Sequence, residues 1–113
     1  MSDIIERPPV YLWLDDERPA PAGWTHAHTV AEAIVILTAG PVEAASLDHD
    51  LSDIDAAGAG DVRAPRERTG YSLLLWMAEH ECWPRQRPVV HSQNPVGRAA
   101  MVQFIARHWK EAP

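Results

Sequence analysis

Three short apolar runs in this chain each end in side chains that carry charge or can transfer protons. Val10 to Leu14 runs into two aspartates, Ala44 to Leu47 into an Asp-His-Asp triplet, and Pro88 to Val90 into a His-Ser pair. A strand that is buried on both faces of a parallel sheet stays apolar until it leaves the sheet. Parallel strands bring their carboxyl ends to one edge, where open α/β sheets form their sites. The pattern therefore predicts a parallel sheet with one functional edge.

Three other segments have helical periodicity and recognisable ends. Thr29 with Glu32 three residues later forms the capping-box pattern, and a Gly-Pro pair stops that helix. Asn94 stands directly before a proline, which is a strong helix start. The predicted helices cover about 30–39, 71–80 and 95–110.

The remaining segments complete the fold. Trp24 to His28 alternates weakly and predicts a short edge strand. Three turn-forming residues interrupt 17–23, so the usual crossover helix after the first strand is missing. The elements predict a small three-layer α/β fold of one domain, 1–113, with a parallel four-stranded sheet of order 2-1-3-4. Residues 1–9 are a predicted tail, and 51–68, which lacks any sustained period, is a predicted mobile flap beside the site.

Composition narrows the setting. A chain of 113 residues with 46% hydrophobic residues can form one hydrophobic core without disulfide or metal crosslinks. The single cysteine, Cys82, cannot form an intrachain disulfide, which fits a reducing compartment. No apolar run is long enough to span a bilayer, and no leader pattern is visible. We therefore expect a soluble, cytoplasmic protein without a membrane partner, and the sequence leaves the oligomeric state open.

The charge balance limits the ligands. The formal net charge is −6, which opposes capture of long nucleic acid because that capture needs Lys and Arg to displace counterions. A small phosphate-containing compound or a cleaved RNA end stays compatible with local positive groups. Lys110 is the only lysine, so contacts with phosphate would come from arginines.

Aspartates after the first and third apolar runs form the main candidate site. Asp15, Asp16 and Asp48 are the oxygen ligands that hard divalent cations prefer. Asp16 could instead pair with Arg18, and adjacent acids are often simply solvated. Asp48 and Asp50 would share one face of a strand and His49 the other, so all three reach the site only if the backbone turns there. His49 could otherwise be a buried structural histidine.

The segment from His91 to Arg98 is the second cluster. A helix start exposes backbone N–H groups and the positive end of a dipole, which favours an anion. Gly97 would allow close approach, and Arg98 could make a forked phosphate contact. The alternative is that Asn94 is only a cap, Gly97 a close-packing position and Arg98 a surface residue.

An acidic pair after the first strand, an Asp after the third and a Ser after the fourth resemble the response-regulator receiver fold, also called flavodoxin-like. That resemblance implies metal ligands at Asp15 and Asp16, a phosphoacceptor at Asp48 and a switch hydroxyl at Ser92. The chain departs from receivers because the first crossover helix, the fifth strand and the lysine at its end are absent.

A closer resemblance covers nearly the whole chain. It rests on Leu14-Asp15-Asp16-Glu17-Arg18-Pro19, Ser46-Leu47-Asp48-His49-Asp50-Leu51, Thr69-Gly70-Tyr71 and His91-Ser92-Gln93-Asn94-Pro95-Val96-Gly97-Arg98. These motifs are similar to those of the receiver-like family of cyclic-phosphate-processing receiver domains. The resemblance implies hydrolysis of a cyclic phosphate, such as a 2′,3′-cyclic nucleotide end or an ADP-ribose cyclic phosphate from RNA repair.

Opening a cyclic phosphodiester needs a base, an acid and positive charge over the phosphoryl oxygens. We assign acid and base work to His49 and His91 without choosing between them, and Asp48 could instead attack phosphorus. The candidate cofactor is Mg²⁺ or Mn²⁺. Asp50 either completes its site or holds His49 in one tautomer. The candidate metal ligands are Asp15, Asp16, Asp48 and Asp50, and the candidate substrate-binding residues are Arg18, Thr69, Ser92, Asn94, Gly97 and Arg98.

Two other functions fit the same residues. A degenerate receiver would bind a nucleotide or a protein partner without turnover, and a phosphorelay receiver would be labelled on Asp48 by a small phosphodonor. Loss of cyclic-phosphate turnover in His91→Ala would support the enzyme. Ligand-induced stabilisation without turnover would support the binding module.

Overall fold

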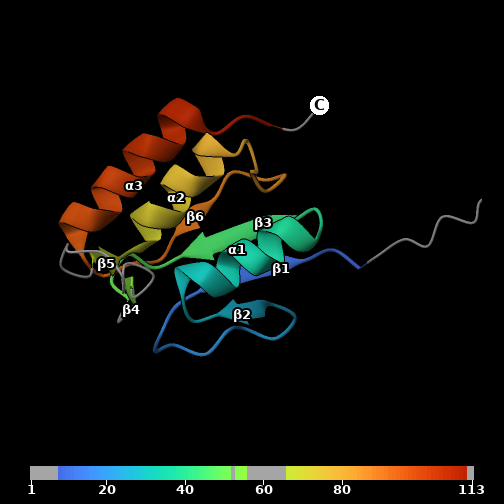
Figure 1. Cartoon of the computed structure of the whole chain (residues 1–113), viewed down its shortest axis with the longest axis horizontal. Coiled ribbons are helices and arrows are strands. Elements are labelled where there is room, and N and C mark those ends of the chain that lie inside the picture. Colours follow the sequence, from blue (N-terminus) through green and yellow to red (C-terminus); the bar gives the residue numbers. More distant parts are fainter. Residues whose placement is uncertain (1–7, 52, 56–65, 112–113) are drawn as a thin grey trace, which may run out of the picture.

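The computed structural model describes residues 8–51, 53–55 and 66–111, and in them a parallel sheet is the central element. Its strands are β1 (Tyr11–Leu14), β2 (Thr25–Ala27), β3 (Ala44–Leu47) and β6 (Val89–Val90). The strand order is β2-β1-β3-β6, and every neighbouring pair is parallel (Figure 1). The predicted fold class and the strand order 2-1-3-4 are confirmed.

Three helices follow the strands: α1 (Val30–Ala39), α2 (Gly70–Glu79) and α3 (Pro95–His108). Thr29 caps α1 by accepting the Glu32 N–H at 3.1 Å. The Glu32 carboxylate accepts the His28 N–H at 3.0 Å, one residue before the position that a capping box uses. Asn94 caps α3 by accepting the Gly97 N–H at 3.0 Å. Side-chain acceptors thus satisfy backbone N–H groups at the starts of α1 and α3, as the sequence predicted.

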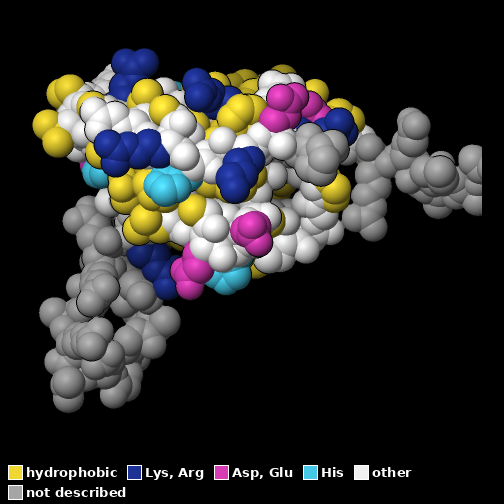
Figure 2. Space-filling view, turned by 90° about the horizontal axis from the view of Figure 1, so that it is seen from above, with side chains coloured by type: hydrophobic (Ala, Val, Ile, Leu, Met, Phe, Trp, Pro, Cys, Tyr) yellow, Lys and Arg dark blue, Asp and Glu magenta, His cyan; other side chains and the backbone are white. Residues whose placement is uncertain are grey.

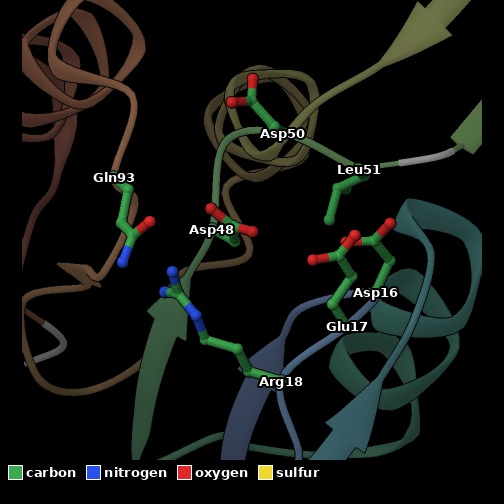
Figure 3. Close-up of a pocket in the computed structure, with 7 residues that line it drawn as sticks. All are labelled: Asp16, Glu17, Arg18, Asp48, Asp50, Leu51 and Gln93. Carbon is green, nitrogen blue, oxygen red and sulfur yellow. The ribbon is translucent and has the colours of Figure 1, made fainter.

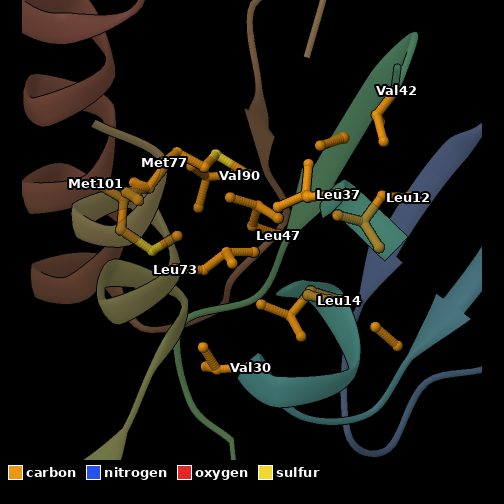
Figure 4. Close-up of a cluster of buried hydrophobic side chains, with 14 of the residues drawn as sticks. Leu12, Leu14, Val30, Leu37, Val42, Leu47, Leu73, Met77, Val90 and Met101 are labelled. Atoms are coloured by element: carbon orange, nitrogen blue, oxygen red, sulfur yellow. The ribbon is translucent and has the colours of Figure 1, made fainter. Parts of the chain in front are cut away.

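One hydrophobic core lies between the sheet and the helices (Figure 4). Leu12 and Leu14 of β1 lie opposite Ala45 and Leu47 of β3, so these four side chains share one face of the sheet. Residues of all three helices pack on that face. The fully buried core side chains include Leu12, Leu14, Leu47, Leu73, Leu74, Met77 and Met101.

The opposite face of the sheet carries aromatic side chains. Tyr11 and Trp13 alternate with the two core leucines of β1 and contact Trp24, with ring centroids 5.5 and 6.1 Å apart. The loop between β1 and β2 folds back on this face, where the Trp13 indole N–H donates to the Arg18 carbonyl at 3.1 Å. The prediction was three layers. The structure has a sheet layer and a helix layer, and the loop between β1 and β2 covers the other face of the sheet, because turn-forming residues replace the helix that would follow β1.

The predicted flap, 51–68, is partly described. It begins at Leu51, which is buried in the core. Two short strands, β4 (Asp53–Asp55) and β5 (Arg66–Arg68), pair antiparallel as a small second sheet. This pairing was not predicted, because three-residue strands carry little periodicity. Residues 52 and 56–65, like 1–7 of the predicted tail, lie outside the described part of the chain.

Among the described residues, no helix is long and apolar enough to cross a membrane. On the face shown in Figure 2, Lys and Arg side chains are scattered among acidic, polar and apolar ones rather than gathered in a band.

Candidate functional site

The carboxyl ends of β1, β3 and β6 meet at one edge of the sheet. The parallel ladder continues one residue beyond each strand: the Asp48 N–H donates to the Leu14 carbonyl at 2.9 Å, and the His91 N–H to the Leu47 carbonyl at 3.0 Å. The Asp15 N–H likewise donates to the Ala27 carbonyl of β2, at 3.1 Å. These backbone hydrogen bonds place Asp15, Asp48 and His91 side by side.

Three carboxylates gather at this edge. One oxygen from each of Asp15, Asp16 and Asp48 can be chosen so that all lie within 4.8 Å of one another. An all-oxygen set with three negative charges fits Mg²⁺ or Mn²⁺, which prefer carboxylates to nitrogen or sulfur ligands. Asp50, the fourth predicted metal ligand, is not in this group.

The Asp15 side chain is buried, with 1% of its surface exposed. Its Oδ1 accepts the N–H groups of Glu17 at 2.8 Å and Arg18 at 2.9 Å, which closes the turn after β1. Burial raises the pKa of the Asp15 carboxyl, but the hydrogen bonds from Arg18, Glu17 and His91 outweigh it. The pKa of Asp15 therefore lies below its ordinary value.

His91 is held on several sides. Its Nε2 lies 3.0 Å from Asp15 Oδ2, and its Nδ1 lies 2.8 Å from Ser46 Oγ. The ring stacks on Trp13, with centroids 3.9 Å apart and planes 4° from parallel. An Arg18 guanidinium N–H donates to the His91 carbonyl at 3.2 Å. Both ring nitrogens are thus committed to protein groups.

His49 has a different environment. Its Nδ1 lies 2.8 Å from Asp50 Oδ1, and the Asn94 amide donates to both oxygens of that carboxylate, at 3.1 and 3.3 Å. Bonds from His49 and Asn94 hold the pKa of Asp50 below its ordinary value. Because Asp50 accepts the Nδ1 proton, the lone pair of a neutral His49 lies on Nε2. This contact is the one that Asp50 would need in order to hold His49 in one tautomer, and that role stays a prediction.

Two glycines allow this packing. A Cβ on Gly97 would lie 2.6 Å from Cδ2 and 2.7 Å from Nδ1 of the His49 ring. A Cβ on Gly70 would collide with the Asp48 carbonyl, and the Gly70 N–H donates to the His49 carbonyl at 3.0 Å. The first turns of α2 and α3 thus pack directly against the Asp48-His49 backbone and ring.

A pocket of about 310 Å³ opens at this edge (Figure 3). Arg18 rises from the turn after β1 toward Asp48, with Glu17 and Asp16 on one side and Gln93 on the other. Among the described residues that line it, four are carboxylates and one is an arginine. The lining residues are Asp16, Glu17, Arg18, Asp48, Asp50, Leu51 and Gln93.

The start of α3, where the sequence predicted an anion-binding site, forms hydrogen bonds within the protein. The Asn94 side chain accepts the Gly97 N–H, and Ser92 Oγ accepts the Asn94 N–H at 3.0 Å. Arg98 is exposed and does not line the pocket. Asn94 is thus the cap of α3 and Gly97 is a close-packing position, and their predicted contacts with substrate stay predictions.

Sequence reasoning found four of the pocket-lining residues: Asp16, Arg18, Asp48 and Asp50. Asp15 lies buried behind them, and His49 and His91 flank the edge without lining the pocket. Thr69 starts α2, where its N–H donates to Ser72 Oγ at 3.0 Å. The lining residues that were missed are Glu17, Leu51 and Gln93; all three stand inside quoted motifs, but their types carried no separate signal.

The fold and site define a receiver-like α/β domain with a carboxylate cluster at its carboxyl edge. A model of the cyclic-phosphate processing receiver domain family matches residues 10–107. The chain therefore belongs to the cyclic-phosphate processing receiver domain family, which confirms the closer of the two resemblances. A search of curated proteins and a search of solved structures gave no significant match.

Proposed function

We propose that the protein hydrolyses a cyclic phosphodiester to a phosphomonoester with the help of a divalent cation. Membership of the cyclic-phosphate processing family supports the substrate class. The observation that carries the proposal is the meeting of Asp15, Asp16 and Asp48 beside a pocket that also holds Arg18. A 2′,3′-cyclic nucleotide end or an ADP-ribose cyclic phosphate, as formed in RNA repair, is the proposed substrate.

The charge of the pocket supports a role for a cation. Four carboxylates and one guanidinium line it, so an anionic phosphate would meet net negative charge. A cation held by Asp15, Asp16 and Asp48 would reverse this balance and, when bound, would neutralise charge on the phosphoryl oxygens. Arg18 would then contact a phosphate oxygen directly. Substrate binding should consequently depend on added Mg²⁺ or Mn²⁺.

We assign proton transfer to His49 rather than to His91. Asp50 accepts its Nδ1 proton, so Nε2 can accept a proton from water. In the proposed step an O–P bond forms from water, one ring P–O bond breaks, and the water proton passes by way of His49 to the leaving alkoxide. Asn94 holds Asp50, and Gly97 leaves room for the ring.

Asp48 could act instead as the nucleophile, with its carboxylate oxygen attacking phosphorus and water cleaving the acyl phosphate afterwards. The Asp48 carboxylate lines the pocket, and its Oδ1 accepts the His49 N–H at 2.8 Å. Incubation with beryllium fluoride and Mg²⁺ tests this route. A stable adduct on Asp48 would support it, and an unmodified Asp48 would favour direct attack by water.

Incubation of the protein with 2′,3′-cyclic nucleotides and ADP-ribose cyclic phosphates tests the proposed hydrolysis. We expect ³¹P NMR to show phosphomonoester in the presence of Mg²⁺ or Mn²⁺, and none with a chelator. Asp48→Asn should lose turnover, whereas His108→Ala, at the exposed end of α3, should keep it. Absence of product from every substrate with either metal would contradict the proposal.

A binding module without turnover is the second candidate. It is favoured by the complete engagement of His91, whose two nitrogens are bonded to Ser46 and Asp15. The same compounds would then raise the melting temperature without being consumed. Labelling of Asp48 by acetyl phosphate would instead indicate a phosphorelay receiver, for which the usual lysine after a fifth strand has no counterpart in this sequence.

A further inference from the structure

A chain of hydrogen bonds runs from Ser46 through His91 to Asp15. Ser46 Oγ lies 2.8 Å from His91 Nδ1, and His91 Nε2 lies 3.0 Å from Asp15 Oδ2. The Ser46 residue is 6% exposed, and the side chains of His91 and Asp15 are 15% and 1% exposed. Water therefore has little access to these groups, and the protein itself supplies their partners.

The direction of the bonds follows from the chemistry of the three groups. An ionised Asp15 carboxylate can only accept, so His91 Nε2 must carry a proton and donate it. A neutral imidazole then has its lone pair on Nδ1, and the Ser46 hydroxyl donates to that lone pair. Ser46 thus favours the one tautomer of His91 that can bond the carboxylate.

The ring is also fixed in its plane. Ser46 and Trp13 are register partners on β3 and β1, on the face opposite the core, and the His91 ring stacks on the Trp13 indole. With one side chain at its edge and another at its face, His91 has little freedom to turn. Asp15 in turn receives three hydrogen bonds, from the Glu17 and Arg18 N–H groups and from His91.

We propose that Ser46 is a positioning residue that acts through His91 to hold the Asp15 carboxylate ready for a divalent cation. In this assignment His91 is also a positioning residue rather than the acid or base. The inference rests on the metal-binding part of the proposed function and adds Ser46 to it. Partners of this kind behind a metal ligand typically change affinity by about 10–100-fold when they are removed.

Metal binding alone gives the first test, with Mn²⁺ as the probe and the free ion measured by electron paramagnetic resonance. Ser46→Ala should weaken Mn²⁺ binding about tenfold, and Ser46→Thr, which keeps the hydroxyl, should restore most of it. Thr29→Ala is the control, because it removes a hydroxyl that caps α1 rather than contacting His91. Wild-type affinity in Ser46→Ala would overturn the proposal, as would equal losses in Ser46→Ala and Thr29→Ala.

NMR of the metal-free protein gives a signature that a purely structural role would not move. In the wild type the ¹⁵N shifts of His91 should show a protonated Nε2 and a hydrogen-bonded Nδ1. In Ser46→Ala the Nδ1 shift should move to the value of an unbonded nitrogen. A protonated Nδ1 in a neutral wild-type ring would overturn the assignment. If Ser46→Ala is too unstable to measure, Ser46→Cys, a weaker donor of similar shape, replaces it in both experiments.

These measurements separate the inference from the hydrolysis itself. Mn²⁺ binding that depends on Ser46, without turnover of any cyclic phosphate, would leave the positioning role standing and remove the enzyme proposal. Turnover that is unchanged by chelators and by Ser46→Ala would remove the positioning role and leave hydrolysis standing. A wild-type protein that binds no Mn²⁺ would overturn the positioning role.

Discussion

His91 and His49 both follow buried strands and were equal candidates for acid and base work, but the fold gives them opposite surroundings. His91 lies behind the carboxylates, stacked on Trp13 and bonded through both nitrogens. Among the described residues, the His49 ring is bonded through Nδ1, to the exposed Asp50. A histidine whose two nitrogens are committed can orient a neighbour, whereas one held at a single nitrogen can also exchange a proton with a ligand.

The comparison shows that position at a strand end does not decide a role by itself. The His91 N–H donates to the Leu47 carbonyl and so extends the parallel ladder by one residue. This bond places His91 at the carboxyl edge of the sheet, next to Asp15. His49 lies where the chain leaves β3, and the starts of α2 and α3 pack against it. The partners that arrive from other elements therefore determine what each imidazole can do.

Replacing His49 should produce the largest effect. His49→Ala removes the proposed proton carrier, so turnover of a cyclic phosphate should fall by about 10²–10⁴-fold at saturating metal. Initial rates measured by ³¹P NMR or chromatography check this, with His108→Ala as the matched histidine control. A variant that keeps wild-type rates would remove the distinction between the two histidines.

Gly97→Ala should displace His49 without deleting it. The added Cβ would press on the His49 ring, so turnover should fall by up to about 10²-fold. The free energy of unfolding should decrease by about 1–3 kcal/mol because the contact is overpacked. Ala100→Gly, at an exposed position of α3, is the control, because it costs about 1 kcal/mol of helix stability without touching the ring. Equal rates in these two variants would contradict the importance of the packing.

His91→Ala should act through the cation. Removing the donor to Asp15 should weaken Mn²⁺ binding by about tenfold, and raising the Mn²⁺ concentration should recover most of the turnover. Rates measured over a range of Mn²⁺ concentrations check this. A large loss of turnover that persists at saturating Mn²⁺ would instead indicate that His91 acts as the acid or base.

The smallest expected effect concerns the pH dependence of Asp50. Its pKa is lower in the folded chain than the ordinary 3.8, so its stabilising bonds are fully present above that value and are lost as the pH falls through the folded-state pKa. Asp50→Asn should therefore lower the melting temperature more at about pH 7 than at about pH 2.5. Thermal unfolding with a chelator present checks this. An equal loss at both pH values would mean that the carboxylate charge contributes nothing.

The sequence by itself determined the elements and the edge that they share. Apolar runs that end in Asp or His, together with the caps at Thr29 and Asn94, predicted the four main strands, the three helices and the strand order. These features are local, because burial and capping act on residues that are close in the chain. The acidic pair and the motifs of the family also predicted a candidate site at the carboxyl ends of these strands.

The tertiary structure alone decided how the layers and side chains combine. Ser46 and His91 are 45 residues apart in the chain, and Asp15 and His91 are 76 apart. Contacts of that separation depend on strand register, and a shift of one residue would turn Ser46 and Trp13 to the other face. The bond from Asn94 to Asp50 joins residues that are 44 apart in the chain, so it has no local signature either. The roles of the two histidines therefore became visible only when the strands were placed side by side.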